Sequence, residues 1–167
     1  ALDSLSLLQL ASRPGRWLRA LHAWSSHAFV LLTLLHAAEH LASEGDRDVA
    51  PGPWLRLSLA VPLLLGLPPT GFMLKGDAEA ELARLVMDGL LEQLPLVGPD
   101  LAVALLGTTE DLQNVYLHHA ATLTLVAAAV AVEHSRRLWP GARATAWALA
   151  AAALLSLLFP PALHAEA

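Results

Sequence analysis

Histidines in two apolar stretches are the residues whose type and spacing could do chemistry. His22 and His36 lie 14 positions apart in one stretch, and His119 and His134 lie 15 positions apart in the other. On an α-helix, 14 positions give a rise of about 21 Å and a net rotation of about 40°, and 15 positions a rotation of about 60°. Each stretch therefore predicts a helix that presents two imidazoles on one face at two separate depths.

Two parallel helices of this kind would bring the imidazoles together in pairs, His22 with His119 and His36 with His134. A neutral imidazole is a good ligand for haem iron, and coordination avoids placing a charged side chain inside a membrane. The alternative is that these histidines only form hydrogen bonds between packed helices. Four imidazoles at matched depths favour two bis-histidine b-type haems stacked across a bilayer.

A zinc or di-iron site would need carboxylates close to the histidines. Glu39 and Glu133 each lie next to a histidine at a predicted helix end. Such sites gather several ligands around the metal, whereas the sequence offers one carboxylate at each place. The sequence therefore favours haem.

Three further histidines in these stretches are placed by helical angle. His118 would lie about 160° from the second histidine of its helix, which makes its neighbour His119 the better ligand. His27 would lie about 180° from His36, and we expect it to form a hydrogen bond to another helix. His40 follows His36 by four positions. We expect it to be a reserve ligand or a polar group near the edge of the second haem.

The composition is that of an integral membrane protein. Hydrophobic residues make up 56% of the 167 residues and charged residues 15%, with a mean hydropathy of +0.53, whereas about 25% of residues in soluble domains are charged. The absence of cysteine excludes disulfides, thiolate metal sites and covalent haem attachment. The net charge of −5 provides no basic surface for nucleic acid, and we find no catalytic nucleophile, general acid or phosphate-binding loop.

Apolar runs and the breaks between them predict an all-α fold, a transmembrane helical bundle of about four spans. The predicted spans are residues 16–43, 54–74, 116–134 and 144–159. The acidic connection 75–115 is expected to form two amphipathic surface helices between the second and third spans, and residues 1–12 a further one. Pro62 and the pair Pro68-Pro69 are expected to kink or unwind the second span near its end.

We divide the chain into a di-haem domain, residues 1–140, and an additional C-terminal transmembrane helix, residues 141–167. The first ten residues lack the charged region of a cleavable signal peptide. Basic residues fall equally on the two sides of the predicted bundle, so the positive-inside rule gives no orientation.

Three segments resemble motifs of cytochrome b from quinol-oxidising bc complexes. Residues 15–36, GRWLRALHAWSSHAFVLLTLLH, are similar to the second-helix pattern G-W-L-x-R-x-x-H-x-W-S with a histidine 14 residues after the first. TGFMLKGD at 70–77 loosely matches TGYxLPWDQ, and LPLVGPDLAVALLG at 94–107 closely follows IPxIGxxLxxxLxG. A spacing of 15 between the later histidines is that of the photosynthetic-type, split version. Residues 1–140 therefore resemble a divergent N-terminal, di-haem domain of cytochrome b.

The resemblance implies roles for individual residues. His22 and His119 would bind the haem nearer the outer membrane face, and His36 and His134 the haem nearer the inner face. Arg19 matches the family arginine three residues before the first ligand and would partner a haem propionate. The family orientation would place the 75–115 connection outside.

Departures from the family pattern affect the quinone site. The first transmembrane helix of the family has no counterpart, Asn114 stands where the family has an arginine, and KGDA at 75–78 replaces PWDQ. The PEWY motif that lines the quinol-oxidation pocket is absent. We therefore expect other membrane subunits to supply the missing helix and the missing quinone-site residues.

The function that these observations predict is electron transfer. The resemblance implies a membrane cytochrome with two haem b groups that relays electrons across the bilayer between a quinone or quinol and a redox partner. It would be a subunit of a respiratory or photosynthetic complex in a bacterial inner or other energy-transducing membrane, and not an enzyme by itself. A separate PEWY-bearing polypeptide could complete a bifurcating quinol oxidase. The alternative is a structural or assembly subunit derived from cytochrome b.

Overall fold

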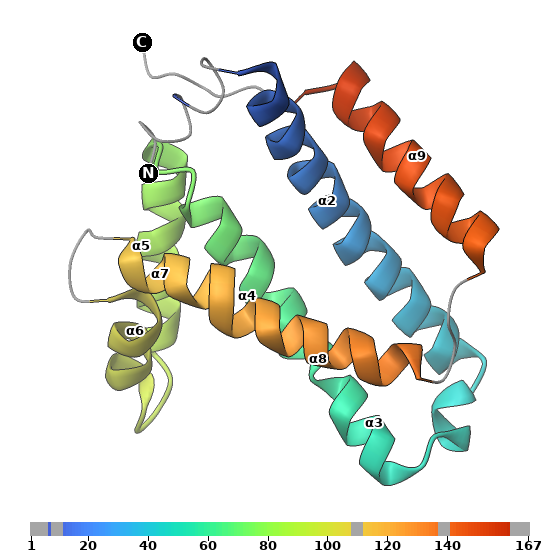
Figure 1. The fold of residues 1–167 in the computed structure, drawn as a ribbon. Coiled ribbons are helices and arrows are strands. Elements are labelled where there is room, and N and C mark those ends of the chain that lie inside the picture. Colours follow the sequence, from blue (N-terminus) through green and yellow to red (C-terminus); the bar gives the residue numbers. More distant parts are fainter. Residues whose placement is uncertain (1–6, 8–11, 108–111, 137–140, 161–167) are drawn as a thin grey trace. The chain divides into compact units, whose positions relative to one another are not determined.

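The computed structural model describes residue 7 and residues 12–107, 112–136 and 141–160. These residues form helices joined by short turns, and no strand occurs among them. The helices, shown in Figure 1, are α2 (Arg13–Ala42), α3 (Pro51–Ser58), α4 (Ala60–Met73), α5 (Ala78–Glu92), α6 (Gly98–Leu106), α7 (Gln113–Leu117), α8 (Leu123–Ser135) and α9 (Ala142–Leu158), with a 3₁₀ turn η1 (Gly45–Asp48) and a π-helical segment η2 (His118–Thr122). The all-α prediction is confirmed for this part of the chain. The helix expected at residues 1–12 lies, apart from residue 7, outside it.

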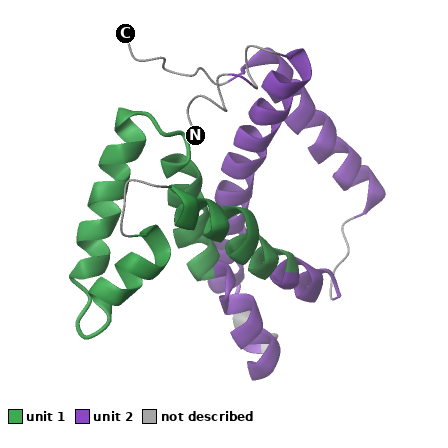
Figure 2. Cartoon of the chain, turned by 60° about the vertical axis from the view of Figure 1, so that its left-hand side comes forward, with its two compact units in different colours: residues 1–6, 61–128, 164–167 green, residues 7–60, 129–163 purple. Residues whose placement is uncertain are grey.

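The chain divides into two compact units (Figure 2). The described part of one unit lies within residues 61–128, and that of the other within residues 7–60 and 129–163. Each unit is considered by itself below.

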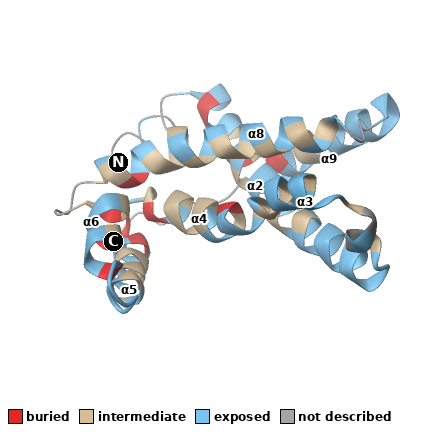
Figure 3. Ribbon diagram, turned by 90° about the horizontal axis from the view of Figure 1, so that it is seen from below, coloured by how far each residue is buried: buried red, intermediate tan, exposed pale blue. Residues whose placement is uncertain are grey.

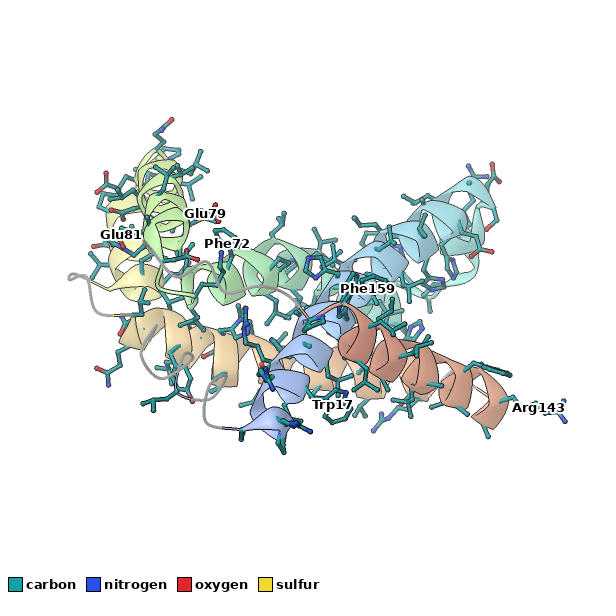
Figure 4. All side chains as sticks on the ribbon, turned by 90° about the horizontal axis from the view of Figure 1, so that it is seen from above. Trp17, Phe72, Glu79, Glu81, Arg143 and Phe159 are labelled. Atoms are coloured by element: carbon teal, nitrogen blue, oxygen red, sulfur yellow. The ribbon has the colours of Figure 1, made fainter. Side chains whose placement is uncertain are left out.

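In the unit that contains α2, this helix is the longest element. The Ser12 hydroxyl caps its N-terminus by accepting from the Gly15 amide at 3.0 Å, and Pro14 occupies its first turn, where a missing N–H costs nothing. α9 lies antiparallel beside α2 (Figure 1), and the Trp24 indole donates to the Phe159 carbonyl at 2.8 Å. Figure 4 shows Phe159 at this end of α9 and Arg143 at the other.

α2 ends in a tight turn. The Ser43 amide donates to the Glu39 carbonyl at 2.9 Å, and Glu44 adopts a left-handed φ of +56°, a conformation that often closes helices. An ion pair between Glu44 and Arg47 spans the turn. The chain therefore folds back so that Gly45 lies against the ring of His40.

The other unit has a small apolar core. Met73, Leu106 and Val115 are buried, and side chains from α5, α6 and the flanking turns pack around them. Asp77 caps the N-terminus of α5 by accepting from the Ala80 amide at 2.9 Å. The two helices predicted in the 75–115 connection are α5 and α6. Leu96, in the turn between them, is 99% exposed and has a left-handed φ of +73°.

The predicted second span is interrupted earlier than expected. Helix α3 ends at Ser58 and α4 begins at Ala60, whereas α4 continues through Pro68 and Pro69 to Met73. Pro62 explains the position of the break, because a proline lacks an N–H and its ring clashes with the carbonyl four residues earlier, here that of Ser58. The unwinding expected near the end of the span does not occur, because Pro68 and Pro69 lie inside α4.

Two segments are long and apolar enough to cross a membrane, Pro51–Met73 and Gln113–Ser135, among the residues that the structure describes. They correspond to the second and third predicted spans. α9 is apolar but shorter, at 17 residues. α2 is long enough, but its four histidines lower its hydropathy. In both units most of the described side chains are exposed and few are buried (Figure 3), as expected for helices whose apolar faces are not covered by the described residues.

Candidate functional site

The structure brings His36 and His134 together from the end of α2 and the end of α8. Their ring centroids are 5.7 Å apart and the ring planes are inclined at 83°. An imidazole nitrogen lies about 2 Å from a metal that it binds, so two imidazoles on opposite sides of one metal have centroids about 6 Å apart. The planes of two axial imidazoles can also be perpendicular to each other, so an inclination of 83° is compatible with this arrangement. The separation of the two rings is therefore close to that expected if both residues were axial ligands of one haem iron.

His40 extends this site by one more imidazole. Its ring centroid lies 5.0 Å from that of His36 in an edge-on arrangement. A Cβ atom added to Gly45 would lie 2.7 Å from Nδ1 of His40, closer than carbon and nitrogen atoms approach without bonding. The absence of a side chain at Gly45 therefore lets His40 occupy its place beside His36.

An ion pair lies next to His134 in sequence. The Arg56 guanidinium of α3 donates to the Glu133 carboxylate at 2.8 Å, and Arg136 approaches the same carboxylate at 4.0 Å. The Glu133 side chain is 18% exposed, so its negative charge is neutralised where solvent access is limited. The sequence drew attention to Glu133 but gave no signal for Arg56, which is 77 positions away.

His119 belongs to the other unit and lies against α4. Its Nδ1 is 3.1 Å from the Thr70 hydroxyl oxygen, and a Cβ atom added to Gly71 would lie 2.8 Å from its Cε1. Gly71 therefore allows the imidazole to approach the α4 backbone. The motif TGFMLKGD contains both Thr70 and Gly71, but the contact of Thr70 with His119 was not predicted, because a hydroxyl close to a histidine leaves no local pattern.

The helix around His119 is locally widened. Residues His118–Thr122 form a π-helical segment, in which the Leu123 amide donates to the His118 carbonyl. The Thr124 hydroxyl donates to the His119 carbonyl at 2.6 Å. π-Bulges of this kind place one extra residue in a helical turn and are frequent at functional sites.

Two other histidines form local hydrogen bonds. The His118 ring contacts the Ala104 carbonyl of α6 through Nε2 at 3.0 Å. His27 contacts the Ala23 carbonyl of its own helix through Nδ1 at 2.7 Å. We expected His27 to form a hydrogen bond to another helix. This contact instead lies within its own helix, because the carbonyl four residues earlier is within reach of the ring.

The remaining predicted site residues lie on α2. Arg19 is partly buried, and His22 is exposed, its carbonyl accepting from the Ser26 hydroxyl at 2.7 Å. Because His22 and His119 belong to different units, their pairing stays a prediction. The role of Arg19 toward a propionate is likewise a prediction.

The segment KGDA, where the family has PWDQ, forms an ion pair and a helix cap. The Lys75 ammonium lies 2.9 Å from the Asp77 carboxylate and 4.4 Å from the centre of the Phe72 ring; Figure 4 labels Phe72. Burial tends to raise the pKa of Asp77, but hydrogen bonds from Lys75 and the Ala80 amide bring that pKa below its ordinary value. The hydrogen bond to Asp77 raises the pKa of Lys75.

Within the described ranges, no three or more histidines and carboxylates gather as a site for a metal ion. Ligation of haem iron needs two axial imidazoles and no such cluster. The donor set present at His36 and His134 therefore suits haem.

The chain is similar to several proteins that are named as cytochromes b. The chain is 27% identical over 138 residues to "Cytochrome b6" of Heliobacterium mobile and 24% identical over 138 residues to "Cytochrome b6" of Bigelowiella natans, in each case over 80% of this chain. The chain is therefore similar to proteins named cytochrome b6 over most of its length. It is also 26% identical over 110 residues to the "Menaquinol:cytochrome c reductase cytochrome b subunit" of Geobacillus thermodenitrificans, which covers 66% of this chain and 49% of that protein.

The resemblance to cytochrome b that the motifs indicated is confirmed. The chain spans about 65% of the length of the cytochrome b6 relatives that it matches. No protein-family model matches the chain, and no solved structure matches it.

Proposed function

We propose that this chain is a b-type cytochrome subunit that relays electrons across a membrane. The observation that carries the proposal is the meeting of His36 and His134, nearly 100 residues apart in sequence, at 5.7 Å between ring centroids. Cytochrome b relatives over 80% of the chain support the same conclusion. Haem, when bound, supplies the one-electron chemistry.

A lipid environment explains the exposed surface. Leucines on α2 such as Leu31, Leu32 and Leu35 are more than half exposed. In each of the two long apolar segments, only 6% of the 18-residue apolar window is buried inside the chain. Such contiguous apolar surface indicates contact with lipid or with other subunits. We infer an integral membrane protein with four spans, in which α2 and the shorter helix α9 supply the two spans besides the long apolar segments, in a bacterial inner or other energy-transducing membrane.

A second haem between His22 and His119 completes the proposal. The π-helical segment supports it, because one residue added within a turn makes 15 positions equivalent to about 14 positions of regular α-helix. The rotation between His119 and His134 then has the same size, about 40°, as that between His22 and His36. The two helices thus have equal spacing between their ligands despite the difference in residue count.

The protein residues bind and orient the two groups. His22 and His119 would hold the outer haem, and His36 and His134 the inner one. The guanidinium of Arg19 would neutralise a haem propionate by charge-assisted hydrogen bonds.

Quinone or quinol is the proposed electron donor or acceptor, as the name of the menaquinol relative suggests for that protein. Other membrane subunits would complete the quinone site and supply a further helix. In the proposed orientation, the 75–115 connection with α5 and α6 lies on the outer face.

The test is a reduced-minus-oxidised spectrum of the purified complex, with haem quantified per copy of this chain. We expect a low-spin b-type signal with two haems per chain. His36→Ala and His119→Ala should each remove one of them. His118→Ala is the matched control, since this ring bonds to the Ala104 carbonyl and should leave both haems in place.

Absence of a b-type signal from the wild-type chain would refute the proposal and favour a structural or assembly subunit. One haem instead of two would refute the pairing of His22 with His119 if His36→Ala abolishes the signal and His119→Ala preserves it.

A further inference from the structure

The hydroxyl of Thr70 has contacts both with its own helix and with the ring of His119. The Thr70 Oγ1 lies 2.6 Å from the Gly66 carbonyl and 3.1 Å from the Leu67 carbonyl. Carbonyl oxygens only accept hydrogen bonds, so the single hydroxyl proton of Thr70 is donated to α4 itself. The oxygen of Thr70 is then left as an acceptor.

The neighbouring imidazole supplies the matching donor. Nδ1 of His119 lies 3.1 Å from this oxygen, and with the Thr70 proton already committed, Nδ1–H must donate. A neutral histidine carries one ring proton. Nε2 of His119 therefore holds the lone pair, as a metal ligand requires.

The backbone reinforces this orientation. A Cβ atom at Gly71 would lie 3.5 Å from Nδ1 and 2.8 Å from Cε1 of His119, so the ring rests directly on α4. The Thr124 hydroxyl holds the His119 carbonyl at 2.6 Å within the π-helical segment. The ring and the backbone of His119 are thus held by separate threonines.

We propose that Thr70 is the positioning residue for His119, fixing its tautomer and making it a more basic ligand. The inference rests on the proposed function, since it concerns the haem that His119 would hold. A group that accepts a hydrogen bond from the ring N–H that is not bound to the metal raises the basicity of a ligand histidine. Loss of such a group typically costs about 10-fold or more in metal affinity. A more basic axial ligand favours ferric over ferrous iron, so Thr70 lowers the reduction potential of that haem.

The experiment is a redox titration of the purified complex carrying Thr70→Val, which keeps the size of the side chain and removes the acceptor. We expect the component that disappears in His119→Ala to move to a more positive potential. A tenfold weaker preference for ferric iron corresponds to about 59 mV for one electron. Thr70→Ser should restore the wild-type potential because it restores the hydroxyl.

Thr124→Val is the matched control, since it removes a hydroxyl that contacts the His119 backbone and not its ring; no shift of potential is expected. Unchanged potentials in Thr70→Val, or the same shift in Thr70→Ser, would overturn the inference while the proposed function stands. If Thr70→Val does not accumulate, Thr70→Ala lacks the same acceptor and is titrated instead. A wild-type chain without b-type haem would refute the proposed function itself.

Discussion

The imidazole of His119 rests on a glycine, and this contact makes a simple test of the site. Gly71→Ala would place a methyl group 2.8 Å from the His119 ring. We expect a loss of about 1–3 kcal/mol in stability, as for overpacked cores, together with loss of the haem that His119 holds. Thermal denaturation and haem quantification of the purified variant measure the two effects.

Gly89→Ala is the control for helix propensity. Gly89 lies inside α5 with no atom within 4 Å of an added Cβ, so alanine should stabilise the chain by about 0.5–1 kcal/mol. Equal effects of the two substitutions would show that the contact with His119 is unimportant.

Asp77 gives the chain a pH dependence on the acidic side. Its pKa is lower in the folded state than its ordinary value of 3.8, so its ionised form stabilises the fold at pH above that value. This stabilisation is lost as the pH falls through the lower, folded-state pKa. Asp77→Asn keeps a capping side chain and removes the charge that pairs with Lys75. We therefore expect a flatter dependence of melting temperature on pH below about pH 4.

Glu79→Gln is the matched control, because Glu79 approaches the same lysine at 3.3 Å but is 68% exposed. An exposed pair contributes little, so its pH profile should resemble the wild type. Asp77→Ala, which also removes the cap, should be less stable at neutral pH by about 1 kcal/mol. A wild-type profile for Asp77→Asn would contradict the role of the ion pair.

At the residue scale, the sequence singled out histidines in apolar surroundings and missed the polar side chains that lie beside them. His36 and His134 were paired from spacing alone because helical periodicity is regular. Thr70 and Arg56 were not predicted, because hydroxyl and guanidinium groups are common and their contacts depend on how helices pack.

At the scale of elements, the π-helical segment explains how one extra residue is accommodated. Deleting Ala121 should convert this segment to regular α-helix with 14 positions between the histidines. We expect both haems to remain, because the ligand spacing would equal that of α2. Absorption spectra and haem content of the variant measure this.

Deleting Ala128, in the regular part of α8, serves as the control. It would turn the following residues by about 100° and should remove the haem that depends on His134. Loss of haem in the Ala121 deletion with retention in the Ala128 deletion would contradict the proposed role of the segment.

Helix positions followed from apolar runs and proline, while their interruptions were harder to predict. α5, α6 and α9 lie close to the stretches where they were expected, because caps and prolines mark their ends. The break at Leu59 was predicted too far along the chain, since the effect of Pro62 falls on the preceding turn. The π-helical segment has no sequence signal of its own: its sequence, HHAAT, is compatible with α-helix.

At the scale of the whole molecule, composition predicted a membrane protein and left its orientation undetermined. Large apolar side chains on α2, α8 and α9 remain exposed in the chain, so the described residues do not form a core that accounts for them.

The exposed leucine in the turn between α5 and α6 offers a way to fix that orientation. Because the sequence has no cysteine, Leu96→Cys would introduce a unique thiol at a position that is 99% exposed. A maleimide that does not cross membranes should label it in intact cells if this turn lies outside, as proposed. Arg47→Cys, at a position 71% exposed on the opposite side of the proposed bundle, should react only after permeabilisation. The reverse labelling pattern would show that every span has the orientation opposite to the one proposed.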